Sequence, residues 1–184
     1  MDDAISSIEH PGLTRQPRKP VLTGGCQCGA VRYALYAQPE NIHICHCRMC
    51  QKAVGGPFAV LVPVRRTDFT WTRGTPEPFR SSTIAERDFC RNCGTPLTFR
   101  YVGKEWISVT VGSLDEPSRA APTAQYGVES RVSWLDRLAS LPGCHTEADT
   151  CANDRLEMHS FQHPDHDTPR SWQSPRPPAP REAR

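Results

Sequence analysis

No stretch of this sequence approaches the roughly 20 consecutive apolar residues that a membrane-spanning helix requires, so no transmembrane segment is expected. Residues 1–10 are acidic and polar, without the basic start and apolar stretch of a secretory signal peptide. Neither charge sign dominates, because 22 basic residues face 20 acidic ones and the formal net charge is +2. A basic face that would bind nucleic acid is therefore not expected. These absences predict a cytoplasmic protein with neither nucleic acid nor membrane as a partner.

Aromatic residues are few, at 8%, and hydrophobic residues make up 37% of the 184 positions, which allows a core of modest size. Proline is abundant, with 18 residues that crowd towards the two ends of the chain. A proline-rich polar segment buries too little apolar surface to offset the entropy lost on ordering. We therefore expect a flexible segment at residues 1–20, one folded domain at residues 21–150 and a disordered tail at residues 151–184.

Hydrophobic patterning predicts a mainly β fold with one or two short helices. Short apolar or alternating segments between glycine and proline residues are typical of strands. They cover residues 29–36, 58–62, 68–72, 86–90, 97–101 and 106–111. A short helix is expected at residues 48–54, ended by Gly55 and Gly56, and a second at residues 132–140.

Nine cysteines stand out in a chain of this kind. In a reducing compartment disulfides are rare, and clustered cysteines more often bind metal or act in catalysis. Seven of the nine form three groups with close spacing. These groups are Cys26 with Cys28, then Cys45 with Cys47 and Cys50, then Cys90 with Cys93.

Two of the groups together predict a closed structural zinc site. Zinc prefers four tetrahedral ligands, and thiolate sulfur suits it. Cys90 and Cys93 have the spacing of a zinc knuckle, and Gly94 gives the turn its freedom to adopt a positive φ. Because this pair supplies two ligands, a second pair is needed, and Cys26 and Cys28 are its natural complement.

The remaining group, Cys45, Cys47 and Cys50, can chelate one ion and leave a fourth position open. Three protein ligands with an open position are typical of catalytic zinc. Two alternatives stay open at this point. One is a single four-cysteine site with three spare thiols, and the other is a purely structural site closed by His43, His46 or a distant residue.

Several further side chains lie outside this pattern. We expect free thiols or solvated imidazoles at Cys144, Cys151, His159, His163 and His166. Arg48 and Lys52 share the short predicted helix with Cys50, so they either bind an anionic substrate or form an exposed helix face.

Four blocks of the sequence resemble a known family. They are GGCQCGAVRY at residues 24–33, CHCRMC at 45–50, FCRNCGTPL at 89–97 and GSLD at 112–115. In this order and spacing they resemble the glutathione-dependent formaldehyde-activating enzyme family, also called the centromere protein V-like family. The resemblance extends over about residues 21–141.

The resemblance implies an Mss4-like zinc-binding β fold and two zinc ions per chain. One would be structural, at the matching Cys26, Cys28, Cys90 and Cys93, and one catalytic in type, at Cys45, Cys47 and Cys50. The activity that gives the family its name joins glutathione and formaldehyde through a carbon–sulfur bond. This implies a carbon–sulfur lyase with a small thiol and an aldehyde as substrates.

The most detailed expectations concern contacts with the substrate. We expect His46, Arg48 and Lys52 to lie near the substrate. Many family members carry a histidine after the fourth block, where this chain has Gln125 and Tyr126. The rival interpretation is a non-catalytic zinc module that binds a protein. In such a module a fourth protein ligand would close the Cys45 group, and no pocket would adjoin it.

Overall fold

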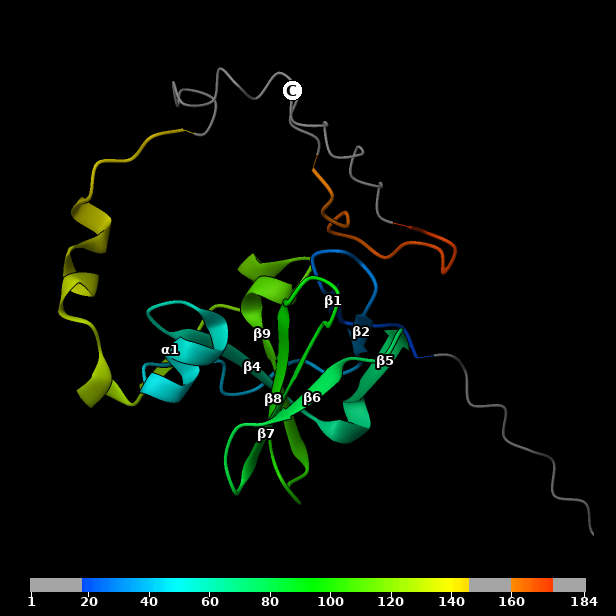
Figure 1. The fold of residues 1–184 in the computed structure, drawn as a ribbon, viewed down its shortest axis with the longest axis horizontal. Helices are drawn as coiled ribbons and strands as arrows, with labels where there is room; N and C mark the ends of the chain where they lie inside the picture. Colours follow the sequence, from blue (N-terminus) through cyan, green and yellow to red (C-terminus); the bar gives the residue numbers. More distant parts are fainter. Residues whose placement is uncertain (1–17, 146–159, 174–184) are drawn as a thin grey trace, which may run out of the picture.

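Ten short strands form two sheets in the computed structural model, which describes residues 18–145 and 160–173 (Figure 1). The smaller sheet has the order β1-β2-β5 and consists of β1 (Leu22–Gly25), β2 (Arg32–Leu35) and β5 (Phe69–Arg73). The larger sheet has the order β10-β3-β4-β9-β8-β7-β6. Its strands are β3 (His43–Cys45), β4 (Ala59–Arg65), β6 (Glu77–Arg80), β7 (Ala85–Phe89), β8 (Pro96–Tyr101), β9 (Trp106–Thr110) and β10 (Ala124–Tyr126). Neighbouring strands are antiparallel except β10 and β3, which are parallel.

The helical part of the described chain is small. It consists of the α-helix α1 (Arg48–Val54) and 3₁₀ helices at Arg66–Asp68, Val111–Ser113, Pro117–Arg119, Val128–Ser130 and Ser133–Ser140. Gly55 ends α1 with a φ of 65°, a left-handed conformation that glycine adopts without strain. The predicted helix at residues 132–140 is a 3₁₀ helix with no buried residue. The prediction of a mainly β fold is therefore confirmed.

The core lies between the two sheets. Leu22 and Leu35 of the smaller sheet pack in one cluster with Val62 and Val109 of the larger sheet. Tyr33 is fully buried in the same cluster, and its hydroxyl group lies 2.7 Å from Ser113 Oγ. This packing holds the loop between β1 and β2, which carries two cysteines, against the larger sheet.

Most predicted strands correspond to strands of the structure, with differences at their ends. The segment at 29–36 becomes a strand only from Arg32, because Gly29 has a φ of 69° in the turn that precedes it. Four strands were not predicted, namely β1, β3, β6 and β10. Each has three or four residues, too few for an alternating pattern to stand out.

Residues 160–173 of the expected tail, drawn in orange in Figure 1, form hydrogen bonds to the domain. The backbone N–H of His163 donates to the carbonyl of Gln27 at 2.7 Å. Arg73 Nη2 donates to the carbonyl of Thr168 at 2.6 Å. Unsatisfied donors and acceptors on the domain thus hold this segment despite its low apolar content. The other expected disordered or flexible residues, 1–17, 151–159 and 174–184, lie outside the described residues.

A membrane-spanning helix is not found in the described part of the chain, where no helix has the necessary length and apolar character.

Candidate metal centres

Two loops from different parts of the chain bring four cysteines together. Cys26 and Cys28 lie between β1 and β2, and Cys90 and Cys93 lie between β7 and β8. Their four Sγ atoms lie within 4.8 Å of one another, with Cys28 Sγ 3.6 Å from Cys26 Sγ and 3.8 Å from Cys90 Sγ. Tetrahedral zinc with bonds of about 2.3 Å places its sulfur ligands about 3.8 Å apart. The geometry of this four-cysteine cluster therefore fits a zinc ion.

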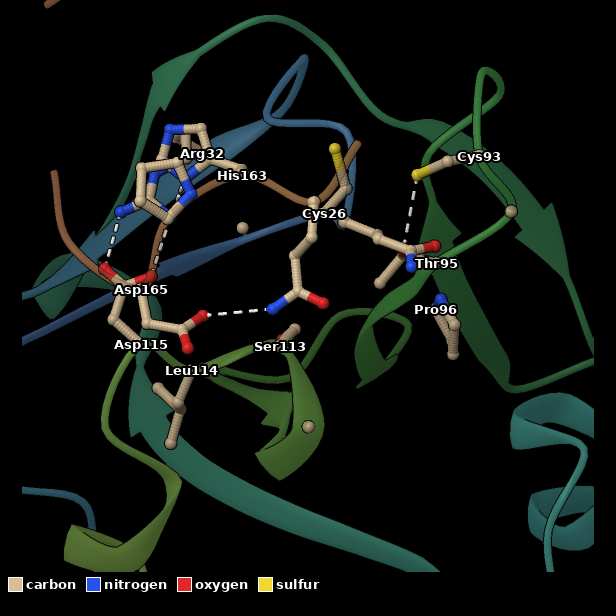
Figure 2. Close-up of a pocket in the computed structure, with 16 residues that line it drawn as sticks. Cys26, Arg32, Cys93, Thr95, Pro96, Ser113, Leu114, Asp115, His163 and Asp165 are labelled. Atoms are coloured by element: carbon tan, nitrogen blue, oxygen red, sulfur yellow. Dashed lines mark hydrogen bonds and ion pairs between the residues drawn. The ribbon is translucent and has the colours of Figure 1, made fainter. Parts of the chain in front are cut away.

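Backbone hydrogen bonds shape both loops for this purpose. The N–H of Gly94 donates to the carbonyl of Cys90 at 2.8 Å, and Gly94 has a φ of 76°. The N–H of Val31 donates to Cys26 Sγ at 3.2 Å. A link between the loops comes from Thr95, whose hydroxyl oxygen accepts from the N–H of Gln27 at 3.0 Å. Figure 2 shows Cys26 and Cys93 on their separate loops, with Thr95 next to Cys93.

The thiols of this cluster differ in how readily they lose a proton. Burial raises the pKa of Cys26 far above its ordinary value. Burial also acts to raise the pKa of Cys93, but hydrogen bonds from Thr95 and from the backbone outweigh it and lower the pKa to about 6. A bound cation would favour the thiolate form of all four side chains.

The three remaining cysteines meet where β3 passes into α1. Cys45 ends β3, Cys47 is the N-cap of α1 and Cys50 lies in its first turn. The three Sγ atoms lie within 4.8 Å of one another, and those of Cys45 and Cys47 are 3.4 Å apart. Gly127 packs against this turn, and a Cβ atom there would lie 2.9 Å from the backbone nitrogen of Cys47. This three-cysteine cluster also offers a donor set suited to zinc.

The pKa values within the three-cysteine cluster are also uneven. Burial and the neighbouring cysteines together raise the pKa of Cys45 to about 12, with burial as the larger cause. Burial opposes ionisation of Cys47 as well, but the hydrogen bond from the N–H of Cys50 and others near it lower its pKa. Cys47 thus loses its proton more readily than Cys45.

Neither histidine considered as a fourth ligand belongs to the three-cysteine cluster. Within residues 18–145 and 160–173, no histidine or carboxylate joins the group of three sulfurs. His43 Nδ1 lies 2.7 Å from the carbonyl of Asn41. The side chain of His46 is 1% exposed, and its Nε2 lies 2.9 Å from Gln125 Oε1. The alternative of a site closed by either histidine therefore finds no support in the structure.

His46, expected near the substrate, is buried. Its ring packs edge-on against Phe58 and lines neither of the cavities beside the three-cysteine cluster. His163, expected to be solvated, is 3% exposed. Cys144 and His166 are exposed as expected, and Cys151 and His159 lie outside the described residues.

A cavity of about 650 Å³ adjoins the three-cysteine cluster, and we name it the cluster cavity. Its wall includes the three cysteines, Met49, Arg87 and aromatic side chains from β8, β9 and β10. A second cavity of about 590 Å³ lies between α1 and strands β6–β8. It contains Arg48 and Lys52, so we name it the basic cavity, and Met49 and Arg87 line both cavities.

Arg87 is a residue of this site that the sequence did not single out. Its Nη2 donates to Cys50 Sγ at 3.3 Å, and its guanidinium lies 4.8 Å from the centre of the Phe99 ring. A hydrogen bond of this kind to a ligand sulfur tunes a metal centre. The one available signal was its position in the strand that leads into Cys90.

Comparisons with known proteins show what this chain is similar to. The sequence profile of a family described as glutathione-dependent formaldehyde-activating enzyme matches residues 21–130. A Schizosaccharomyces pombe protein named as an uncharacterized lyase is 30% identical over 82 residues, which are 45% of this chain and 59% of that protein. The chain thus matches less than two thirds of that relative's length. A crystal structure of a Rhodobacter sphaeroides protein is 25% identical, covers 56% of this chain and 98% of its own, and has a TM-score of 0.46.

Proposed function

Because this chain belongs to the glutathione-dependent formaldehyde-activating enzyme family, we propose that it is a zinc-dependent carbon–sulfur lyase. Its proposed substrates are a glutathione-like thiol and a small aldehyde such as formaldehyde. The observation that carries this proposal is the cluster cavity, which gives the three-cysteine cluster access to a small molecule. A protein-binding module would not need such access.

The two clusters have different proposed roles. Cys26, Cys28, Cys90 and Cys93 would hold a structural zinc ion, since four sulfurs complete its coordination. Cys45, Cys47 and Cys50 would hold a second zinc ion with one open position. Zinc in that open centre would lower the pKa of a bound thiol and so supply a thiolate at neutral pH.

In the forward reaction the thiol sulfur uses an electron pair to form a bond to the carbonyl carbon. The π electrons of the carbonyl move to its oxygen, which receives the proton that the thiol gave up. The reverse reaction breaks the carbon–sulfur bond and releases the aldehyde. Arg87, which donates to Cys50 Sγ, partly offsets the negative charge of the three thiolates.

Arg48 and Lys52 are the proposed contacts for a carboxylate of the thiol. Both line the basic cavity, which shares the lining residues Met49 and Arg87 with the cluster cavity. A tripeptide thiol can therefore place its sulfur at the three-cysteine cluster and an anionic end beside these two cations. Ion pairs at such exposed positions contribute modestly to affinity, about 0.2–1 kcal/mol each.

Metal analysis of two serine variants, combined with a turnover assay, tests the proposed function. We expect two zinc ions per chain in the wild type. Cys47→Ser should stay folded with one zinc ion and lose turnover of glutathione and formaldehyde, measured by exchange NMR. Cys93→Ser should aggregate or unfold, because structural zinc binding contributes directly to folding.

Cys144→Ser is the matched control, since Cys144 is exposed and outside both clusters. It should keep two zinc ions and full turnover. Full turnover in Cys47→Ser would contradict the proposal. Two bound zinc ions without turnover of any thiol and aldehyde in the wild type would favour the non-catalytic module.

A further inference from the structure

The size and wall of the cluster cavity carry an inference about the aldehyde. Resting on the proposed function, we infer that the cluster cavity binds an apolar group of about the size of a phenyl ring, carried by the carbonyl substrate. The preferred aldehyde is then aromatic or branched aliphatic, and formaldehyde fills only a small part of the available space.

The volume is the first argument. Pockets of about 300–1,000 Å³ bind ligands of drug size, and the cluster cavity has about 650 Å³. A water molecule takes up about 30 Å³ in the liquid, and formaldehyde, with two heavy atoms, is not much larger. A thiol carbon, a sulfur and formaldehyde would therefore leave most of the cavity to water.

The chemistry of the wall is the second argument. Phe99, Tyr101, Trp106 and Tyr126 line the cavity from three strands. Phe99 and Tyr101 already pack edge-to-face, with ring centres 5.0 Å apart. Tyr101 and Tyr126 are large aromatic residues, yet 50% and 54% of their surfaces are exposed to solvent. Aromatic rings that remain exposed around a hollow present faces and edges that another ring can pack against.

The charges in the cavity are the third argument. Two cations line it, Arg87 and Arg100, and both are engaged. Arg87 donates to Cys50 Sγ, and Arg100 donates to Glu86 at 2.9 Å and pairs with Asp88. No carboxylate is among the described residues that line the cavity. Both arginines of the cluster cavity thus already have partners, whereas the basic cavity next to it offers Arg48 and Lys52.

One adduct of the thiol and the aldehyde would then occupy both cavities. The anionic end of the thiol lies in the basic cavity, the sulfur lies at the three-cysteine cluster, and the apolar group of the aldehyde lies in the cluster cavity. The carbon–sulfur bond forms or breaks where the cavities meet, with the same movement of electrons and proton as for formaldehyde.

A pair of stable thioethers tests this division without any chemical step. S-Benzylglutathione resembles the adduct of an aromatic aldehyde, and S-methylglutathione resembles that of formaldehyde; each lacks only the hydroxyl group. With the zinc-loaded full chain in titration calorimetry, we expect the benzyl compound to bind more than about tenfold more tightly, as apolar groups do in apolar pockets.

Variants of aromatic residues provide a second test and its control. Tyr101→Ser and Tyr126→Ser shorten half-exposed side chains, so both proteins should fold, and each should reduce the preference for the benzyl group. Phe79→Ser is the matched control, because Phe79 is an exposed aromatic residue of the basic cavity alone. It should keep the preference found in the wild type.

Equal dissociation constants for the two thioethers would overturn the inference and leave the proposed function intact. A preference that survives in both tyrosine variants would also overturn it. If benzyl mercaptan binds but neither glutathione derivative does, the apolar cavity is supported and the glutathione part of the proposed function fails. If sedimentation shows a dimer that both tyrosine variants dissociate, a second copy covers the cavity and the inference is overturned.

Discussion

At the scale of single residues, Arg87 contacts both the three-cysteine cluster and the two cavities beside it. It contacts Cys50 Sγ, packs over Phe99 and lines both cavities. A guanidinium that donates to a ligand sulfur withdraws charge from it. With three anionic ligands around one divalent cation, such withdrawal strengthens the interaction of the metal with a fourth, substrate ligand.

Replacement of Arg87 should alter the metal centre itself. In Arg87→Met loaded with Co²⁺, we expect the sulfur-to-cobalt charge-transfer bands to move to lower energy, because the sulfur loses a hydrogen bond. Metal affinity of this centre should fall by about 10–100-fold, as measured by competition with a chelator. Arg48→Met serves as the control, since Arg48 lies nearby but has no contact with a ligand sulfur. An unchanged spectrum in Arg87→Met would contradict this role.

At the scale of structural elements, the segment 160–173 supports the loop that carries Cys26 and Cys28. His163 lies 2.8 Å from Thr168 Oγ1 through its Nε2 and packs edge-on against Trp172. A Cβ atom on Gly29 would lie 2.3 Å from the ring of His163, so this loop and the segment fit closely. We therefore assign the segment a supporting role at the four-cysteine cluster.

Removal of the imidazole should weaken that support. His163→Ala should lower the free energy of unfolding by about 1–3 kcal/mol, because its buried partners lose a hydrogen bond and packing. Zinc should leave the four-cysteine cluster faster on addition of chelator, while release from the three-cysteine cluster stays the same. The exposed His166 supplies the control His166→Ala, with no expected change in either measurement. Equal release rates in both proteins would speak against a supporting role.

At the scale of the whole molecule, a buried ion pair joins the smaller sheet to the segment that follows β9. Arg32 of β2 donates through both Nη atoms to Asp115, at 2.7 and 2.6 Å. Thr23 Oγ1 donates to the same carboxylate at 2.5 Å. Burial alone would raise the pKa of Asp115, but these hydrogen bonds and the charge of Arg32 outweigh it and lower the pKa.

Asp115→Asn should therefore destabilise the protein by about 3–5 kcal/mol at pH 7, since it leaves the buried Arg32 charge with only the exposed Asp167 carboxylate, 3.5 Å away, as a charged partner. The folded pKa of Asp115 lies below its unfolded value of about 3.9. Its stabilising contribution is thus fully present above that pH and is lost as the pH falls through the folded pKa. Urea unfolding of both proteins should show their difference shrinking below about pH 4, and a constant difference would refute this account.

Local spacing was enough to predict several features. A tight turn places cysteines two or three positions apart around one ion, so the two sets of cysteines were recognisable from the sequence. Gly55 after α1 marked the end of that helix, because few other residues adopt a positive φ there. Alternating segments likewise indicated the mainly β fold.

Other features depend on contacts between distant parts of the chain. The wall of the cluster cavity comes from β8, β9 and β10, and no periodicity in the sequence relates these strands to Cys45. His46 lies between two cysteines, yet it turns inward to Gln125, 79 positions away. Arg73 holds the tail at Thr168, 95 positions away. Local propensity cannot predict such pairs, because their free energy arises only when tertiary packing removes both groups from water.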